Sequence, residues 1–324
     1  MKAVMLEQFG STDHMKYVDI EVPSLQSHQV LIRVSATCVN FADIKSRIGK
    51  KGQGKLPLLL GLEASGIVEQ VGDDVHGLQV GQRVIAFPHN GSYAEYVVAD
   101  EHLVFAIPDS MDIESAGACG IVSFLSYILL IDVARLQYGE NVLVHAAAGG
   151  VGTTIIQVAR ALGAGRIIGT VGHARKIPIA IQAGADDVIC HEDADYAEQV
   201  NHLTNGKGVD IIIDSIGGDV TTQIFNYLAP YGRLVICGNS SGQYSMLDTG
   251  SLHSSCRSVL GYSFGTTRKE RPHLLQETAI QVFRLFENGQ LKVQIGERYA
   301  LQDAALAHQR IESRQSSGKI LLIP

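Results

Sequence analysis

Residues 142–162 read VLVHAAAGGVGTTIIQVARAL, and this stretch decides the fold. Residues 142–144 are an apolar run that is expected to be a strand, and residues 153–162 have the spacing of an amphipathic helix. A strand, a glycine-rich turn and a helix in this order are typical of a site that binds a dinucleotide. Gly149 allows a tight turn close to a pyrophosphate, and Gly152 allows the helix to pack closely on the strand.

The start of this helix is expected to bind the anion. The first N–H groups of a helix have no partner within it, and the helix dipole is positive at that end. The alternative is a glycine-rich turn that binds nothing, and the strand–helix units that follow argue against it. The first small residue of the pattern is Ala146 rather than glycine. The residues predicted to hold the pyrophosphate are Ala148, Gly149, Gly150, Val151 and Gly152.

Strands and helices are expected to alternate from residue 141 to about residue 237. The expected strands are Val142–His145, Arg166–Val171, Asp187–Cys190, Val209–Asp214 and Arg233–Cys237. Helical stretches such as Thr153–Leu162 and Lys176–Gln182 lie between them. This alternation predicts an α/β domain with a parallel sheet and helices on both faces.

The first 100 residues are β-rich instead. Val30–Val39 alternates as a half-buried strand does, and Gly66–Val71 and Gly91–Val98 have a similar pattern. Short strands separated by glycine turns predict a small barrel-like unit. Near the end, Pro272–Asn288 is expected to be a helix, and Ile320–Ile323 is expected to be a strand that returns to this first domain.

Length and composition restrict the class of protein. The 324 residues fit two domains, and 46% hydrophobic with 18% charged residues allow a buried core. The net charge of −7 argues against general nucleic-acid binding, which requires a basic face. The longest apolar stretch, Cys119–Ile131, is shorter than the about 20 residues that span a bilayer, so no membrane partner is expected. Five widely spaced cysteines fit a reducing, cytoplasmic compartment.

The end of the second strand of the α/β domain predicts NADPH rather than NADH. Sites specific for NAD carry an acidic residue there, about 20 residues after the glycines, to bind the ribose 2′-hydroxyl. Here Gly172 follows the strand and leaves room for a 2′-phosphate, while His173, Arg175 and Lys176 come directly after it. These cations would pair with the phosphate. The alternative is that Arg175 and Lys176 are solvated residues of a helix start.

Three motifs carry a resemblance to a known family. Residues 61–68 (GLEASGIV) and the turn from Gly72 to Val84 resemble elements of the medium-chain dehydrogenase/reductase superfamily. Residues 139–160 (GENVLVHAAAGGVGTTIIQVAR) resemble the signature of its zinc-free quinone oxidoreductases, the zeta-crystallin-like branch. Residues 238–242 (GNSSG) resemble a late loop of those enzymes, and the resemblance extends over essentially the whole chain.

This resemblance implies an α/β fold with two domains. Residues 1–122 and 259–324 would form a GroES-like β-barrel domain, and residues 123–258 a Rossmann domain with a doubly wound parallel sheet. The cofactor would lie in the cleft between the two, with residues 40–43 at its nicotinamide end. The further cofactor contacts implied are Asn40, Gly172, Arg175, Lys176, His191, Ser215, Asn239, Ser240, Tyr262, Ser263 and Arg314.

Two departures concern the site. His191 stands where close relatives have a tyrosine near the adenine ribose, and a protonated histidine would bind a 2′-phosphate more strongly. Lys45 stands where relatives have a tyrosine near the nicotinamide. The catalytic zinc ligands of related dehydrogenases align with Asn40 and Leu62, neither of which binds zinc, so no metal is expected.

The implied activity is the reduction of a quinone by NADPH without a metal. The cofactor carries this chemistry, and water can supply the proton. The candidate catalytic residues are Asn40 and Asp43, with the alternative that both cap a turn after the preceding strand. Two other functions stay open: reduction of the C=C bond of an enal or enone, and a non-catalytic NADPH-binding role, structural or RNA-binding. The relatives imply a homodimer or homotetramer, and the physiological substrate is not set by the sequence.

Overall fold

The computed structural model describes residues 1–50, 55–191 and 196–324, which divide into two compact units. The first, here called the β unit, comprises Met1–Val122, Thr267–Glu287 and Val293–Pro324. The second, here called the α/β unit, comprises Ser123–Thr266 and Asn288–Lys292. The expected boundary at residues 258 and 259 falls inside strand β14 (Ser258–Gly261), which pairs with the sheet of the α/β unit, so that unit extends to Thr266.

The α/β unit contains a six-stranded parallel sheet in the order β11-β10-β9-β12-β13-β14. The first strand in sequence lies at the middle of the sheet, and the chain winds outward from it in both directions. This is the strand order of a Rossmann fold, and the expected doubly wound sheet is confirmed. The strands are β9 (Val142–Val144), β10 (Ile167–Val171), β11 (Asp187–Cys190), β12 (Val209–Asp214), β13 (Leu228–Ile236) and β14.

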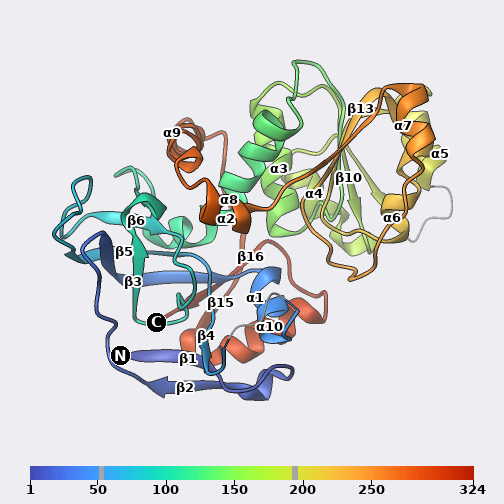
Figure 1. The fold of residues 1–324 in the computed structure, drawn as a ribbon. Coiled ribbons are helices and arrows are strands. Elements are labelled where there is room, and N and C mark those ends of the chain that lie inside the picture. Colours follow the sequence, from blue (N-terminus) through green and yellow to red (C-terminus); the bar gives the residue numbers. More distant parts are fainter. Residues whose placement is uncertain (51–54, 192–195) are drawn as a thin grey trace. The chain divides into compact units, whose positions relative to one another are not determined.

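Helices cover both faces of this sheet. In Figure 1, α3 and α4 lie on one side of the strands, and α5 and α7 lie on the other. Leu143, Ile168, Ile212 and Leu234 pack between the sheet and helices that include α5. The helical segments are η3 (Leu129–Val133), α3 (Gly150–Ala161), η4 (Ala174–Lys176), α4 (Ile177–Gln182), α5 (Tyr196–Leu203), α6 (Asp219–Thr222), η5 (Ile224–Asn226) and α7 (Thr249–Ser255).

The β unit contains two sheets. A three-stranded sheet has the order β2-β1-β4, and a seven-stranded sheet has the order β15-β16-β3-β5-β6-β8, with β7 pairing with β3. The strands are β1 (Lys2–Leu6), β2 (Met15–Asp19), β3 (Gln29–Val39), β4 (Leu58–Leu59), β5 (Ala64–Val71), β6 (Arg83–Ala86), β7 (Tyr96–Asp100), β8 (Val104–Ala106), β15 (Ile295–Ala300) and β16 (Lys319–Ile323).

The helical segments of the β unit lie between and after these strands. They are η1 (Thr12–His14), α1 (Phe41–Arg47), η2 (Glu101–Leu103), α9 (Leu274–Glu287), η6 (Leu301–Asp303) and α10 (Ala304–Glu312). The divisions between the two units fall within α2 (Ile113–Ile128) and α8 (Phe264–Glu270).

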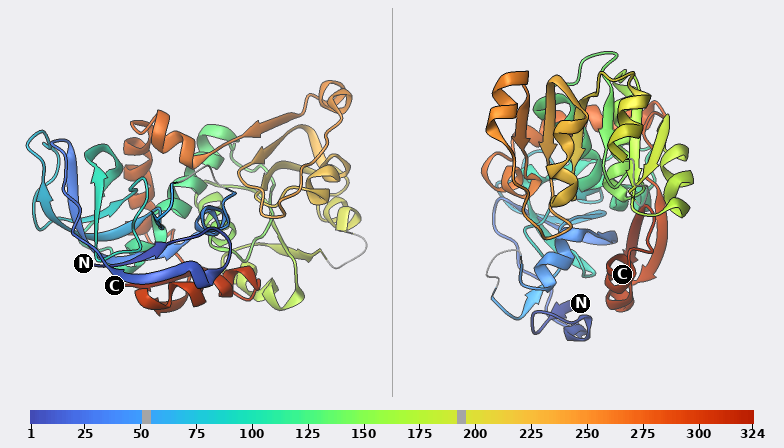
Figure 2. Two further views of the ribbon diagram at one scale, coloured as in Figure 1. Left: turned by 60° about the horizontal axis from the view of Figure 1, so that its bottom comes forward. Right: turned by 90° about the vertical axis from the view of Figure 1, so that its right-hand side faces the viewer.

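Strand β3 organises the larger sheet. It was expected to be half-buried, but only Arg33 along it is exposed, because it pairs with β5, β7 and β16. The expected return of the last strand is confirmed, since β16 pairs with β3 and β15. Both chain ends therefore lie in the β unit, close together in each view of Figures 1 and 2.

One expected strand lies further along the chain. Gly91–Val98 was expected to be a strand, but β7 begins only at Tyr96. The segment before it instead lies between two other segments of the protein. Tyr93 N–H donates to Leu60 O, and Tyr93 O accepts from Val4 N–H. The Tyr93 side chain is fully buried there.

The apolar helix is longer than the apolar run in the sequence. Helix α2 continues through the π-helical turn η3, which gives 21 residues, and an 18-residue window within them has a mean hydropathy of 1.9. This length and composition would suffice to cross a membrane. However, 72% of that window is buried inside the protein, as in the core helix of a folded domain.

Candidate functional site

The glycine-rich turn and the start of α3 build the first part of the site. Helix α3 begins at Gly150, three residues earlier than expected, so Gly150, Val151 and Gly152 form its first turn. The N–H groups of these residues have no acceptor one turn earlier in the helix. A Cβ on Gly152 would lie 2.4 Å from the carbonyl oxygen of Ala146. Only glycine therefore lets the helix start this close to the turn.

Two backbone hydrogen bonds fix the turn, one to strand β10 and one within the turn itself. Ala147 N–H donates to Thr170 O at 2.9 Å, and Gly149 N–H donates to Ala146 O at 2.9 Å. Ala146 itself has a φ of 53°, in the left-handed region that glycine adopts without strain. The turn therefore lies at the carboxyl end of β9 with the start of α3 directed away from the strand.

The end of β12 brings a second loop to the same edge of the sheet. Asp214 is fully buried and accepts hydrogen bonds from Ile216 N–H at 2.7 Å and Gly217 N–H at 3.2 Å. Ser215 O in turn accepts from Ser240 N–H at 3.0 Å, which holds the loop of residues 238–242 beside it. Strands β9 and β12 are neighbours at the point where the strand order reverses, which is where open α/β sheets bind ligands.

The end of β10 is open and basic. A Cβ on Gly172 would have no atom within 4 Å, so space for a ligand group lies beside this backbone. The next residues form η4, where the His173 side chain accepts from Arg175 N–H at 3.3 Å. Arg175 is exposed and Lys176 is half-buried on this turn. The structure thus places two cations directly after the open backbone.

A buried polar chain connects three strands beneath the turn. His145 Nδ1 and His191 Nε2 each lie 2.9 Å from the Thr170 hydroxyl oxygen. His145 follows β9, His191 follows β11, and Thr170 lies near the end of β10. Burial lowers the pKa of His145 to about 4, despite the opposing effect of Asp214, and burial likewise lowers the pKa of His191. His191 is therefore neutral at pH 7. The sequence did not predict this chain, whose members are linked only by strand order.

Asn239, Tyr262, Ser263 and Arg314 lie in three different places. Asn239 Oδ1 accepts from Gly242 N–H at 2.9 Å, within the loop held at Ser215. Tyr262 and Ser263 directly follow β14 at the same end of the sheet, two strands beyond β12. Arg314 belongs to the β unit, where it follows α10 with a φ of 58°. The fold thus brings the contacts of the α/β unit to one edge of its sheet.

In the β unit, Asn40 and Asp43 lie where β3 ends and α1 begins. Asn40 is the residue before the helix, and its backbone N–H donates to Asp43 Oδ2 at 2.8 Å. Asp43 is 1% exposed, whereas Asn40 is partly exposed. Asp43 thus caps the helix, as the alternative interpretation had it. Only the Asn40 side chain of the two is accessible.

The Asn40 side chain joins a buried charged cluster that the sequence did not predict. Its Nδ2 donates to Glu63 Oε1 at 2.8 Å, and its Oδ1 accepts from Lys319 Nζ at 2.7 Å. Lys319 Nζ also lies 3.2 Å from Glu63 Oε1, and both side chains are almost fully buried. Cys38 Sγ donates to the same oxygen at 2.8 Å, and Ile121 N–H donates to Glu63 Oε2 at 2.6 Å.

The charges of this cluster balance. Burial alone would lower the pKa of Lys319, but the Glu63 carboxylate beside it raises that pKa above its ordinary value. Burial raises the pKa of the Cys38 thiol well above its ordinary range, so the thiol stays protonated. The negative charge that balances Lys319 is therefore that of Glu63. The sequence signal that could have indicated this cluster is that Glu63 and Lys319 each stand beside apolar residues.

A second buried chain lies behind Asp43. Arg47 Nε donates to His308 Nδ1 at 3.3 Å, and His308 Nε2 lies 3.2 Å from the Tyr93 hydroxyl. Burial raises the pKa of Tyr93 well above its ordinary value, and the charge of Asp43 and a hydrogen bond to it add to this effect. Burial, together with the charge of Arg47, lowers the pKa of His308 to about 3. The start of α1 is thus fixed by buried polar contacts.

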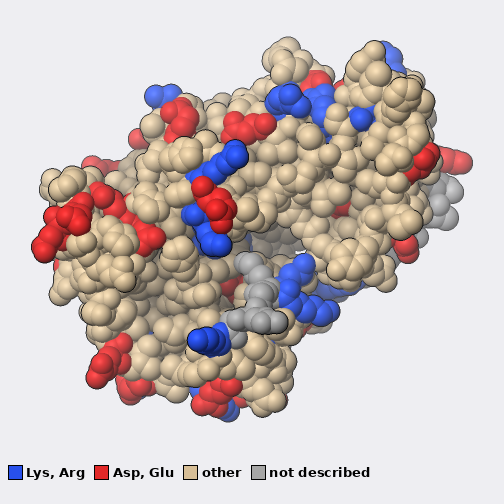
Figure 3. Space-filling model, in the orientation of Figure 1, with Lys and Arg blue, Asp and Glu red and all other residues tan. Residues whose placement is uncertain are grey.

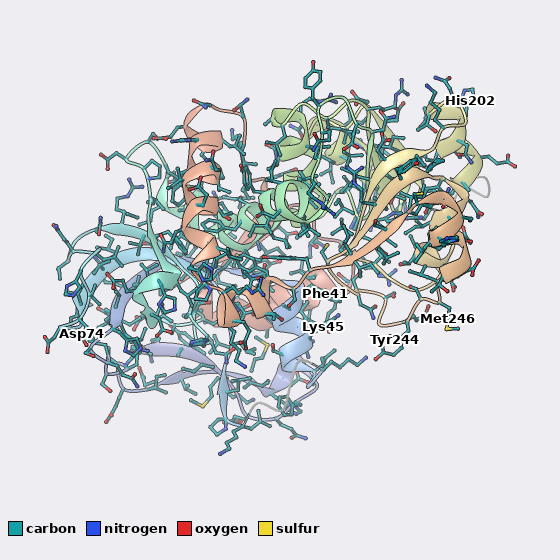
Figure 4. The ribbon with its side chains drawn as sticks, turned by 45° about the horizontal axis from the view of Figure 1, so that its top comes forward. Phe41, Lys45, Asp74, His202, Tyr244 and Met246 are labelled. Atoms are coloured by element: carbon teal, nitrogen blue, oxygen red, sulfur yellow. The ribbon has the colours of Figure 1, made fainter. Side chains whose placement is uncertain are left out.

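Lys45 and Phe41 lie on the exposed side of the same helix. Lys45 Nζ is 5.7 Å from the centre of the Phe41 ring, and Figure 4 labels both side chains, Phe41 at the start of α1 and Lys45 in its last turn. Burial, and then the charge of Lys50, lower the pKa of Lys45. The residue that departs from the family's tyrosine therefore places a cation beside an exposed aromatic ring.

The donor set does not suit a metal ion. Within residues 1–50, 55–191 and 196–324, no group of three or more His, Cys, Asp or Glu side chains has the arrangement of a metal site. The resemblance aligns Asn40 and Leu62 with the zinc ligands of related dehydrogenases, and Leu62 is a buried apolar residue. In contrast, the start of α3 and the open backbone at Gly172 fit a phosphorylated dinucleotide.

Comparison with known proteins agrees with this geometry. Residues 26–109 match the alcohol dehydrogenase GroES-like domain, and residues 150–280 match the family described as zinc-binding dehydrogenase. A quinone oxidoreductase of Pseudomonas aeruginosa is 36% identical, and the match covers 100% of this chain and 99% of that protein. The chain belongs to the zinc-free quinone oxidoreductase branch of the medium-chain dehydrogenase/reductase superfamily.

Other members of the branch match equally completely. The human quinone oxidoreductase is 34% identical, with 100% of this chain and 98% of that protein covered. The crystal structure of Escherichia coli quinone oxidoreductase complexed with NADPH has a TM-score of 0.94 at 32% identity, with 100% of both chains covered. The expected family and its GroES-like and Rossmann domains are confirmed. The absence of a catalytic zinc stays a prediction, which rests on Asn40 and Leu62, since neither side chain is a usual zinc ligand.

Proposed function

We propose that this protein reduces quinones with NADPH and does so without a metal ion. The observation that carries the proposal is the end of β10, where open backbone at Gly172 is followed by Arg175 and Lys176. An acidic residue at this position would favour NADH. Residues 172–185 contain no Asp or Glu, and the first acidic residues after Val171 are Asp186 and Asp187. Two related structures with 32% and 33% identity are described as complexed with NADPH.

The residues of the α/β unit have distinct roles in this proposal. The N–H groups of Gly150, Val151 and Gly152 bind the pyrophosphate, because they are unsatisfied and lie at the positive end of α3. Arg175 and Lys176 bind the 2′-phosphate. Ser215, Asn239 and Ser240 line the same edge, and we assign further contacts to Ala148, Gly149, His191, Tyr262, Ser263 and Arg314.

His191 takes a more limited role than its substitution for tyrosine suggested. Its Nε2 is committed to Thr170, and its lowered pKa keeps the ring neutral at pH 7. We therefore assign it to hydrogen bonding near the adenine ribose, and not to charge pairing with the phosphate.

When bound, the reduced nicotinamide supplies a hydride. The Asn40 amide is the accessible polar group of the β unit that we assign to the reacting end, where its N–H donates to the substrate carbonyl or to the carboxamide. Asp43 is a positioning residue, because it is buried and holds the backbone of Asn40. Besides the hydride, quinone reduction takes up one proton, which comes from water, so the chain needs no acid of its own.

The surface charge indicates the kind of substrate, and the edge strand β14 indicates association with further copies of the protein. On the face in Figure 3, basic and acidic side chains form small separate groups, and the net charge of −7 agrees with a small-molecule substrate instead of nucleic acid. We propose a homodimer or homotetramer, supported by β14, which ends its sheet with half-exposed side chains at Val259 and Leu260. We place the protein in the cytoplasm on its cysteine pattern.

The test is NADPH consumption by chelator-treated protein with 1,4-benzoquinone, 9,10-phenanthrenequinone or an α,β-unsaturated aldehyde. Turnover of a quinone that survives chelation is expected. Turnover of the aldehyde alone would assign the protein to the C=C reductases. Loss of activity on chelation would contradict the metal-free chemistry, and binding of NADPH without any turnover would favour a non-catalytic role.

A further inference from the structure

The Asn40 amide is held at both ends by buried charges. Its Nδ2 donates to the Glu63 carboxylate, and its Oδ1 accepts from the Lys319 ammonium. Glu63 and Lys319 are 1% and 4% exposed at their side chains, so water does not compete for these contacts. A low effective dielectric strengthens hydrogen bonds to charged groups.

These two charges permit a single orientation of the amide. A rotation of 180° would bring Oδ1 against the carboxylate of Glu63 and the NH2 group against the ammonium of Lys319. Both contacts would be repulsive, at positions now separated by 2.8 and 2.7 Å. Asn40 therefore cannot exchange its donor and acceptor ends while the ion pair is in place.

The amide has donor capacity beyond its contact with Glu63. Nδ2 has two N–H bonds, and one of them is used by Glu63. Among the residues that the structure describes, Nδ2 also contacts the Cys38 sulfur at 3.8 Å, a weak acceptor. Because Asn40 is partly exposed, its second N–H can donate to a ligand oxygen, and the ammonium on Oδ1 polarises the amide and strengthens that donor.

We propose that Lys319 and Glu63 are positioning residues that orient and polarise the Asn40 amide toward the oxygen of the hydride acceptor. This inference rests on the proposed function and extends it to two residues outside the cofactor site. As a quinone accepts hydride, negative charge develops on its oxygen, and a fixed N–H donor stabilises that charge without reorganisation.

The packing around Glu63 is consistent with this role. A Cβ on Gly120 would lie 2.6 Å from Glu63 Oε2, so the carboxylate fits only because α2 has glycine there. Ile121 N–H fixes the same oxygen at 2.6 Å. Ile121 N–H thus fixes Oε2 of Glu63, while Oε1 contacts Asn40, Cys38 and Lys319.

The test separates orientation from simple stability. Lys319→Met and Glu63→Gln each leave one buried charge unbalanced, whereas the double variant K319M/E63Q removes both charges and has nearly the original shape. Stability is therefore expected to fall in the single variants and to recover in the double variant. The amide orientation does not recover, because no charge then distinguishes its two ends. The control is R310M/E297Q, which removes a surface ion pair of the same unit.

The expected kinetic result concerns kcat for the quinone. K319M/E63Q should lower kcat by about tenfold to a hundredfold, with an unchanged Kd for NADPH. In an Asn40→Ala background the same pair should have no further effect on kcat, because both residues act through Asn40. Recovery of kcat together with stability, or an equal loss in the Asn40→Ala background, would overturn the proposal.

A readout without substrate keeps this test separate from the proposed function. The side-chain amide of Asn40 gives two 15N-coupled proton resonances, which are assigned by their loss in Asn40→Ala. They should be widely separated in the wild type and should shift and exchange faster with solvent in K319M/E63Q. Unchanged resonances would overturn the inference even if no quinone were reduced. A wild type that binds NADPH but reduces no quinone, with the expected shifts, would overturn only the proposed function.

Discussion

Lys319 Nζ lies 2.7 Å from Asn40 Oδ1, and this contact joins residues that are 279 positions apart in the sequence. Lys319 is the first residue of the last strand, and Asn40 is the residue at which the first long strand gives way to α1. The pairing of β16 with β3 brings them together. The return of the chain end therefore completes both the β unit and the surroundings of its accessible amide.

Lys176 is expected to determine the preference for NADPH. Lys176→Ala removes one of the cations that pair with the 2′-phosphate. A charge-assisted hydrogen bond of this kind contributes about 1.5–3 kcal/mol. The Kd for NADPH should therefore rise by roughly tenfold to a hundredfold, while the Kd for NADH stays the same. Fluorescence titration with both cofactors measures this. Lys207→Ala, at an exposed lysine of the same unit, is the control. Equal losses for NADPH and NADH would argue against the 2′-phosphate assignment.

Two glycines at the cofactor site should respond differently to substitution. A Cβ at position 172 meets no protein atom within 4 Å, so the fold should be kept in Gly172→Asp. The new carboxylate repels a 2′-phosphate and can bind a 2′-hydroxyl, which shifts the ratio of kcat/KM from NADPH toward NADH. Gly152→Ala instead places a methyl group 2.4 Å from Ala146 O, so both thermal stability and NADPH binding should fall. A fully stable Gly152→Ala would contradict the close start of α3.

Stability should fall as the pH drops below about 6.5, because two buried histidines resist protonation. The folded pKa of His145 is about 4 and that of His308 about 3. Between these values and 6.5 the unfolded chain binds protons that the folded chain does not, so the free energy of unfolding decreases with decreasing pH. For His145 the loss is on the order of 3 kcal/mol between pH 7 and 4. Urea unfolding of the wild type and of His145→Asn measures it, and the variant should show the shallower dependence.

Arg314 allows backbone strain and cofactor binding to be measured separately. Its φ of 58° is unfavourable for a residue with a Cβ, so Arg314→Gly should raise the free energy of unfolding by roughly 0.5–1 kcal/mol. If Arg314 contacts the cofactor, the same variant binds NADPH more weakly. Arg135, with a φ of 54°, gives the matched control, since Arg135→Gly should stabilise without changing the Kd. Unchanged NADPH binding by Arg314→Gly would remove this residue from the site.

Lys45 is expected to affect the choice of quinone. Its ammonium lies beside the exposed ring of Phe41, where a planar anionic substrate would meet both an aromatic face and a cation. Lys45→Tyr restores the residue of the relatives and should lower kcat/KM for a sulfonated naphthoquinone relative to its neutral parent. Parallel assays of the two quinones measure the ratio. An unchanged ratio would show that Lys45 does not contact the substrate.

The sequence predicts those features that depend on neighbouring residues. The turn from Ala146 to Gly152, the strands that flank it and the cations after Gly172 all lie within short stretches with clear physical signatures. The residues around Asn40 were not predicted, because Glu63 and Lys319 are separated by 256 positions and meet only through the strand pairing. The same holds for His145 and His191, which are linked through Thr170 by the order of three strands. The sequence pattern also did not indicate that the segment before Tyr96 bonds to β1 instead of extending β7.

The most direct test of the central claim is a comparison of kcat/KM for NADPH and NADH, with 1,4-benzoquinone as acceptor and chelator-treated protein. We expect quinone-dependent oxidation of both cofactors, with NADPH preferred by about tenfold or more, since its 2′-phosphate pairs with Lys176 and Arg175. Equal values for the two cofactors, a preference for NADH, or no oxidation above the protein-free rate would contradict it.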